Sequence, residues 1–146
     1  MLMGEFEHSI DAKGRTVLPA KMRDEVGEKF VITCGTDGCL FGYPQTAWLE
    51  FEEQLNKLPI TTNPQARKMN RFFLAKASEC ERDKQGRFPI PTNLREFAGL
   101  DKEVVIVGTG KRFEIWDKAK WNAMNDIMLD DIDATFASLE ESGLSL

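Results

Sequence analysis

The chain has few of the side chains that hold metals or form disulfide networks. Its 146 residues include one histidine, His8, and three cysteines, Cys34, Cys39 and Cys80. This set does not match the usual four-ligand spacings of zinc sites, so we predict no metal and no cofactor. Cys34 and Cys39 flank a short loop, but we expect free thiols in a reducing compartment.

Long apolar runs are also absent. No stretch approaches the roughly 20 apolar residues of a membrane-spanning helix. Residues 1–5 lack the charged and apolar regions of a signal peptide. We therefore expect a cytoplasmic protein with no membrane partner.

A basic excess is missing as well, because the net charge is −5. The acidic surplus is concentrated at the C-terminus, where residues 122–146 contain six carboxylates and no lysine or arginine. Residues 1–121 therefore sum to +1. Since salt confines surface fields to about 10 Å, a local basic patch can still bind phosphate. The acidic charge weakens a nucleic-acid interpretation without excluding it.

We find no convergent set of catalytic residues. His8 and Ser9 are neighbours in a predicted strand, so they point to opposite faces and cannot form a triad with Asp11. The stretch Gly108-Thr109-Gly110-Lys111 is not a phosphate-binding loop, because it lies in a predicted hairpin with no helix after it. We predict that the protein is not an enzyme and has no catalytic residues.

What the sequence does contain is an internal repeat. Asp11-Ala12-Lys13-Gly14-Arg15 recurs 72 residues later as Asp83-Lys84-Gln85-Gly86-Arg87. Other positions match too, namely Leu18-Pro19 with Ile90-Pro91, Arg23 with Arg95 and, after a one-residue insertion, Trp48 with Trp121. Self-similarity of this kind indicates two copies of one structural unit. Because independent domains need about 100 residues, we expect two half-domains that share one core.

The fold class predicted from the repeat is α+β, with two β-β-α-β-β-α half-units. In the first half, a hairpin over 5–10 and 15–18 carries the basic motif, and a short helix follows at 20–26. A second hairpin over 30–34 and 39–43 then leads to a longer helix at 46–58. The second half has the same elements over 77–82, 87–90, 92–98, 103–108, 111–116 and from 118 onward, with its last hairpin turning at Gly108-Thr109-Gly110. We divide the chain into repeats at 1–58 and 77–121, a connecting segment and helix at 59–76, and an acidic helical tail at 122–146.

Two segments have no repeat partner, and each has two interpretations. Asn63 and Pro64 predict the start of a helix over 65–76 that has an apolar and a basic face. This helix either packs on the core with a solvated edge or faces DNA or another subunit. The tail has apolar residues at helical spacing, which favours a helix packed on a neighbour. The alternative is a disordered acidic tail that repels non-specific DNA.

The repeated motif has the chemistry of a stiff basic turn. The carboxylates of Asp11 and Asp83 can accept hydrogen bonds from backbone N–H groups of the turn, while Gly14 and Gly86 allow a left-handed backbone. Five basic residues then extend from the two loops as candidate DNA contacts: Lys13, Arg15, Arg82, Lys84 and Arg87. Arginine matches phosphate or the guanine edge, and lysine adds a point charge. The structural alternative is a salt bridge within each turn.

These residues resemble the MraZ family, which belongs to the AbrB-like (SpoVT-AbrB) swapped-hairpin β-barrel superfamily. The resemblance rests on residues 11–19 and 83–91, and it is supported by Leu74-Ala75-Lys76-Ala77-Ser78-Glu79-Cys80, Val104-Val105-Ile106-Val107-Gly108 and Phe113-Glu114-Ile115-Trp116-Asp117. It covers about residues 3–121. The pairing of two Asp-x-x-x-Arg motifs with these segments is more specific than either motif alone.

The resemblance implies a bacterial, nucleoid-associated DNA-binding transcriptional regulator, mainly a repressor. Its halves would build one pseudo-twofold, double-split barrel with peripheral helices, and its subunits a homo-oligomeric ring of about eight to twelve copies. Family members bind direct repeats in double-stranded DNA upstream of their own gene, at the head of the division and cell-wall gene cluster. Arg15 and Arg87 match the motif arginines, and Asp11 and Asp83 match the turn-shaping positions.

Two other interpretations stay open. The chain could be a protein-interaction module, as in antitoxins of the same superfamily, although such antitoxins resemble one half-unit that dimerises. It could also be a structural ring protein whose arginines make salt bridges between subunits.

Overall fold

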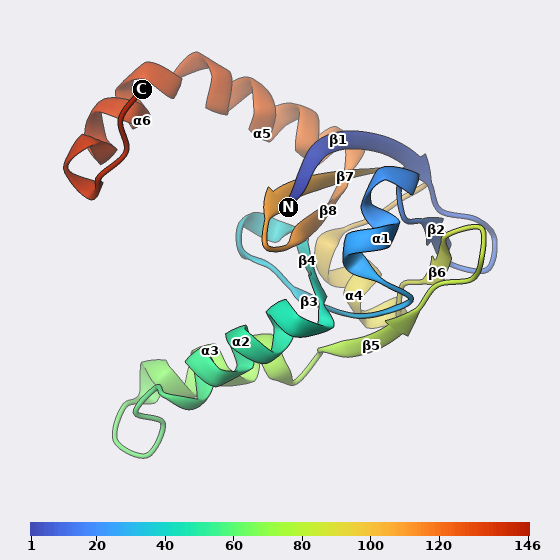
Figure 1. Ribbon diagram of the computed structural model, residues 1–146, viewed down its shortest axis with the longest axis horizontal. Coiled ribbons are helices and arrows are strands. Elements are labelled where there is room, and N and C mark those ends of the chain that lie inside the picture. The colour runs from blue at the N-terminus through green and yellow to red at the C-terminus, as the bar shows by residue number, and fades with distance from the viewer.

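The computed structural model describes residues 1–146 and contains two antiparallel sheets, with the longer helices projecting to one side of them (Figure 1). The strands are β1 (Leu2–Ser9), β2 (Arg15–Val17), β3 (Lys29–Cys34), β4 (Leu40–Pro44), β5 (Ser78–Glu81), β6 (Arg87–Pro89), β7 (Glu103–Gly110) and β8 (Phe113–Asp117). The α-helices are α1 (Arg23–Val26), α2 (Gln45–Asn56), α3 (Pro64–Leu74), α4 (Thr92–Ala98), α5 (Lys118–Asp130) and α6 (Ile132–Leu139). The predicted α+β class is confirmed.

The strand order shows how the two halves are combined. The larger sheet has the order β1-β7-β8-β4-β3-β5, and the smaller sheet pairs β2 with β6. If β1, β3 and β4 are exchanged for their repeat partners β5, β7 and β8, the larger order becomes its own reverse. The first strand of each half pairs with the other half, because β1 lies on β7 and β5 lies on β3. The halves are therefore intertwined, and their closure into a barrel stays a prediction.

The expected hairpins around the two basic turns are both wrong. β1 and β2 enter different sheets, and so do β5 and β6, while β2 forms its ladder with β6 of the other half. Beyond the ladder, the N–H of Leu18 donates to the carbonyl of Gly86, and that of Ile90 donates to Gly14. Backbone groups that we expected to bond within one half bond across the two halves instead, since each half offers the other an equivalent strand edge.

The expected reversal at Gly108-Thr109-Gly110 is also misplaced. β7 continues to Gly110 because β1 pairs with it along its whole length, with Leu2 opposite Gly110. The chain reverses at Lys111 and Arg112, where the N–H of Thr109 donates to the carbonyl of Arg112. A sheet partner from the other half therefore decided the position of this turn.

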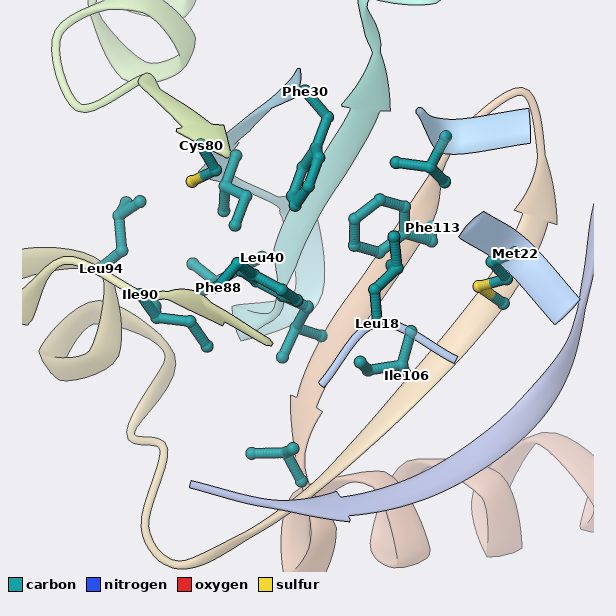
Figure 2. Close-up of a cluster of buried hydrophobic side chains, with 14 of the residues drawn as sticks. Leu18, Met22, Phe30, Leu40, Cys80, Phe88, Ile90, Leu94, Ile106 and Phe113 are labelled. Atoms are coloured by element: carbon teal, nitrogen blue, oxygen red, sulfur yellow. The ribbon is translucent and has the colours of Figure 1, made fainter. Parts of the chain in front are cut away.

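The main core is built from both halves (Figure 2). Leu18 and Met22 from the first half meet their repeat partners Ile90 and Leu94 in one buried cluster. Phe30 lies edge-on to Phe88 and Phe113, with ring centroids 5.1 and 5.9 Å apart. Each fully buried side chain of this size contributes about 1.5–3 kcal/mol, so neither half would be stable without the other.

A second apolar cluster lies under α2, α3 and α5. It contains Phe41, Tyr43, Phe73, Trp116 and Trp121. The helix over 65–76 that we predicted is α3, and Asn63 caps it by accepting from the N–H groups of Gln65 and Ala66. The apolar face of α3 packs on the core, because Phe73 belongs to this second cluster. None of the helices is both long and apolar enough to cross a bilayer.

Candidate nucleic-acid interface

The two Asp-x-x-x-Arg turns lie together at one end of the molecule. They are the loops that connect β1 to β2 and β5 to β6, both on the right in Figure 1. The pairing of β2 with β6 holds them there, with Arg15 opposite Pro89 and Val17 opposite Arg87. Residues 72 positions apart in sequence therefore form one surface, which follows from the intertwined fold.

The first turn is held by the carboxylate of Asp11. Its Oδ1 accepts from the N–H groups of Lys13 and Arg15 at 2.9 Å, and its Oδ2 accepts from the Nε of Arg15 at 2.9 Å. The N–H of Gly14 donates to the Asp11 carbonyl at 3.0 Å, with φ of +77° at Gly14. The carboxylate of Asp11 thus holds both the backbone of the loop and the guanidinium of Arg15.

The second turn repeats this arrangement. Oδ1 of Asp83 accepts from the N–H groups of Gln85 and Arg87 at 2.9 Å, and Oδ2 accepts from the Nε of Arg87 at 2.8 Å. Gly86 has φ of +84° and donates to the Asp83 carbonyl. The same five-position motif therefore folds the same way twice.

These hydrogen bonds favour the ionised form of both carboxyl groups. The backbone N–H of Arg15 is the main cause that lowers the pKa of Asp11 below its usual value, and its guanidinium adds to the effect. The N–H and guanidinium of Arg87 lower the pKa of Asp83 in the same way. At neutral pH each turn therefore combines a fixed carboxylate with a fixed guanidinium.

The salt bridge within each turn leaves most of the arginine donors free. Each arginine bonds to its aspartate through Nε alone. A guanidinium has five N–H donors, so four on the Nη atoms stay available. The side chains of Arg15 and Arg87 are 28% and 42% exposed. The structural alternative is therefore compatible with a binding role, because the bridge occupies only one of the five donors of each guanidinium.

The three other predicted contacts occupy two kinds of environment. Lys13 and Lys84 are exposed and make no salt bridge, so each offers a free ammonium beside a turn. Arg82 is half-buried, and its Nε donates to the Gly27 carbonyl at 3.1 Å while its Nη1 donates to the Asp83 carbonyl. Arg82 therefore mainly joins the second turn to the end of α1.

Sequence reasoning missed two arginines that cover the turns from the opposite half. A Cβ placed on Gly14 would lie 2.9 Å from Cζ of Arg95, and one on Gly86 would lie 2.5 Å from Nε of Arg23. The repeat already aligned these two arginines with each other. Their contact with the turns could not be inferred, because it depends on the exchange of strands between the halves.

The two covering arginines are bonded differently. Nε of Arg23 donates to the Leu18 carbonyl at 2.9 Å. Arg95 instead donates from Nη2 to the hydroxyl of Thr92 at 3.0 Å, and its buried Nε has no partner. The second turn is therefore covered by the more firmly held arginine.

A hollow of about 790 Å³ lies beside the first turn. Its charged lining mixes signs, with Asp11, Glu96 and Asp101 facing Arg95 and Lys102. It does not gather the donors that a small anion needs. No group of three or more His, Cys, Asp or Glu side chains is arranged to hold a metal ion.

Comparison with known proteins gives one consistent match. The model of the MraZ protein family, whose description adds the term antitoxin-like, matches residues 1–72 and again residues 73–137. The transcriptional regulator MraZ of Lachnoclostridium phytofermentans is 50% identical over 145 residues, which are 99% of this chain and 99% of that protein.

Two further relatives have the same name. Transcriptional regulator MraZ of Desulforamulus reducens is 49% identical over 146 residues, which are 100% of this chain and 99% of that protein. The MraZ regulator of Carboxydothermus hydrogenoformans is 56% identical over 122 residues, which are 84% of this chain and 85% of that protein. With a family match to both halves and relatives this similar along almost the whole chain, the protein belongs to the MraZ family.

Proposed function

We propose that this protein is a sequence-specific DNA-binding transcriptional regulator, acting mainly as a repressor. It binds direct repeats upstream of its own gene, at the head of the bacterial division and cell-wall gene cluster. The relatives named transcriptional regulators support the general role. The observation that supports the assignment of the binding site is the pair of equivalent turns at one end of the molecule. Each turn has a fixed arginine whose Nη donors are free.

Each residue has a distinct role in this proposal. Arg15 and Arg87 contact base edges or phosphates, while Lys13 and Lys84 contact the phosphate backbone. Asp11, Gly14, Asp83 and Gly86 shape the turns, and Arg82 holds the second turn on α1. The intramolecular bridges support this role, since a preorganised fork loses less conformational freedom on binding.

The proposed active form is a homo-oligomer, a ring of about eight to twelve subunits whose turns meet successive DNA repeats. Linked contacts can raise avidity by about 10²–10⁴, so several modest turns can give tight binding. The DNA then bends or the ring opens, at a deformation cost. Each subunit comprises the two repeats, connecting segment and tail divided as the sequence predicts, with its sheets closed into one barrel.

The test compares wild type with Arg15→Ala by fluorescence anisotropy on DNA from upstream of the gene, with scrambled DNA as control. We expect Arg15→Ala to weaken specific binding by about 1–3 kcal/mol, which is roughly 5–150-fold. Lys111→Ala is a matched control, because it removes one cation at the far end of β7 from the first turn. Its specific affinity should stay near that of wild type.

Light scattering on the same samples separates the alternatives. Loss of specific binding with the assembly intact supports the regulator. Equal weak binding of wild type to both DNAs favours a protein-interaction module of antitoxin type. Loss of assembly in Arg15→Ala favours the structural ring.

A further inference from the structure

Residues 122–146 form an acidic arm that leaves the body of the protein (Figure 1). Trp121 is buried in the second apolar cluster and Met124 packs against it. Beyond this point the hydrogen bonds of the chain are local to the arm, within α5, α6 and the 3₁₀ turn Glu140–Ser142. None of its six carboxylates takes part in a salt bridge.

The arm also exposes large apolar side chains. Ile127 is 61% exposed, Leu129 60% and Ile132 47%. A helix of eight residues such as α6 is marginal in water without packing, and clustered apolar surface usually marks an interaction site. The carboxylates of the arm therefore have no cationic partner in the same chain, and its large apolar side chains stay exposed.

A second projection has the opposite charge. Residues 57–76, here called the basic hairpin, comprise the connection that follows α2, the helix α3 and the two residues after it. They contain five lysines and arginines and no carboxylate. Lys68 and Arg71 are exposed and unpaired, and Arg67 donates only to the carbonyl of Ile60. Ile60 and Met69 are 40% and 41% exposed. Apolar and basic groups thus occur together on this projection.

The basic hairpin also contains a hollow of about 280 Å³. Ile60, Arg67 and Arg71 line it together with Asn70, whose side-chain oxygen is buried without a hydrogen-bond partner. A buried polar atom left unpaired costs about 1–3 kcal/mol, so this site gains from a docked polypeptide that brings a donor.

We propose that the acidic arm of one copy docks on the basic hairpin of a second copy of this chain. Six carboxylates face five cations, and exposed apolar residues on both surfaces supply contact area. The contact joins two different surfaces, one on each copy, so it can continue head-to-tail from subunit to subunit, as the proposed ring requires. DNA would not cover the apolar residues of the arm, and its phosphates would repel the carboxylates.

The positions of the two projections suit this assembly. Figure 1 shows the arm and the basic hairpin on one side of the sheets, and the two Asp-x-x-x-Arg turns on the other. Docking between copies would therefore leave the turns exposed for DNA. This inference rests on the homo-oligomer in the proposed function and assigns its interface.

A charge-swap experiment tests the contact with the full chain. The first variant is Asp126→Lys, Asp130→Lys, Asp131→Lys, Asp133→Lys, which changes the charge of the arm from −6 to +2. The second is Arg67→Glu, Lys68→Glu, Arg71→Glu, which changes the charge of the hairpin from +5 to −1. Light scattering after size exclusion follows mass against concentration, from the 16.6 kDa monomer upward. Each variant alone brings like charges together, so we expect the concentration at the dissociation midpoint to rise about tenfold or more.

Mixing the two variants in equal amounts supplies the decisive comparison. The basic arm of the first variant then meets the acidic hairpin of the second, and the reverse pair is equally complementary, so the wild-type mass should return. Such rescue requires that both variants fold, which circular dichroism checks. Lys21→Glu, Lys29→Glu, Lys102→Glu is the matched control, because it reverses three exposed charges elsewhere and should assemble like wild type.

Four results would overturn the inference. Variants that keep the wild-type mass, or folded variants that fail to rescue each other, show that the contact lies elsewhere, while the oligomer itself stands. A hairpin variant that assembles normally but binds DNA weakly makes the hairpin a DNA surface. A wild type that stays monomeric at all concentrations removes both the contact and the proposed oligomer.

Discussion

The two basic turns have the same internal geometry but different surroundings. The bond from arginine Nε to aspartate Oδ2 is 2.9 Å in the first turn and 2.8 Å in the second. Above the second turn Arg23 is bonded to a backbone carbonyl, whereas above the first Arg95 is bonded to a threonine hydroxyl. Five consecutive residues therefore determine the turn, while the opposite half determines how it is held.

A single repeat position accounts for this difference. Thr92 corresponds to Ala20 in the first half, so Arg23 has no equivalent hydroxyl beside it and donates to the Leu18 carbonyl instead. Duplication preserved the binding element, and divergence altered its support. The second turn should therefore be the more rigid of the two.

The largest expected effect comes from removing both motif arginines. If each turn contacts DNA, Arg15→Ala and Arg87→Ala should each cost about 1–3 kcal/mol. The double variant should lose more than either single variant, because the two guanidinium groups bond to different aspartates and share no partner. Anisotropy titrations on operator DNA measure this. A double variant no weaker than Arg15→Ala would show that only the first turn touches DNA.

Substitution of the turn glycines should lower the free energy of unfolding by different amounts in the two turns. A Cβ at positive φ costs about 1–2 kcal/mol at Gly14 and Gly86 alike. At Gly86 it must also displace Arg23, which is bonded to a carbonyl, so we expect Gly86→Ala to reduce the free energy of unfolding more than Gly14→Ala does. Urea titration measures the difference.

Gly38→Ala is the control for backbone strain alone, because Gly38 has φ of +83° and nothing lies within 4 Å of a Cβ placed there. It should cost no more than Gly14→Ala. Equal losses at Gly14 and Gly86 would contradict the unequal support of the two turns.

A smaller effect is expected from the covering arginines themselves. Arg23→Met keeps an apolar stem but removes a hydrogen bond from a charged donor, which costs about 1.5–3 kcal/mol at a buried site and less here, where Arg23 is half-exposed. Arg95→Met should cost less, since Arg95 bonds only to an exposed hydroxyl and leaves a buried Nε unpaired. Thermal unfolding of the two variants provides the comparison. The reverse order would refute it.

The smallest effect concerns pH. The pKa values of Asp11 and Asp83 are lowered in the folded protein, so their contribution to stability is complete above the ordinary aspartate pKa, about 3.9, and declines as pH falls below it. Stability from these groups should be constant between about pH 5 and 8. Urea unfolding of wild type and of Asp11→Asn, Asp83→Asn measures this. The variant should lose part of the decline at low pH, and an unchanged acid profile would contradict the assignment.

The local sequence correctly indicated most individual elements. Asn63 and Pro64 begin α3, and α4 ends before Gly99, which has a left-handed backbone. These features depend on a few neighbouring residues, since capping and left-handed geometry are local properties. The motif predicted the loop conformation around Gly14 and Gly86 for the same reason.

The local sequence pattern could not predict which distant strands pair with each other. A hairpin around the first turn satisfies the same alternation as the observed exchange, in which β1 pairs with β7 and β2 with β6. The reversal at Lys111 and Arg112 was likewise missed because it depends on the length of β1. Alternation specifies which face of a strand is buried but not which strand lies beside it.

The sequence by itself determined two equivalent basic turns, an α+β repeat and an acidic C-terminus, because these follow from residue type and spacing. Only the tertiary structure brought the turns together through β2 and β6, and placed Arg95 and Arg23 on Gly14 and Gly86. The physical reason is that each half supplies hydrogen-bond partners for the backbone of the other half and covers its apolar surface. The surface that the turns share is therefore a product of their joint folding.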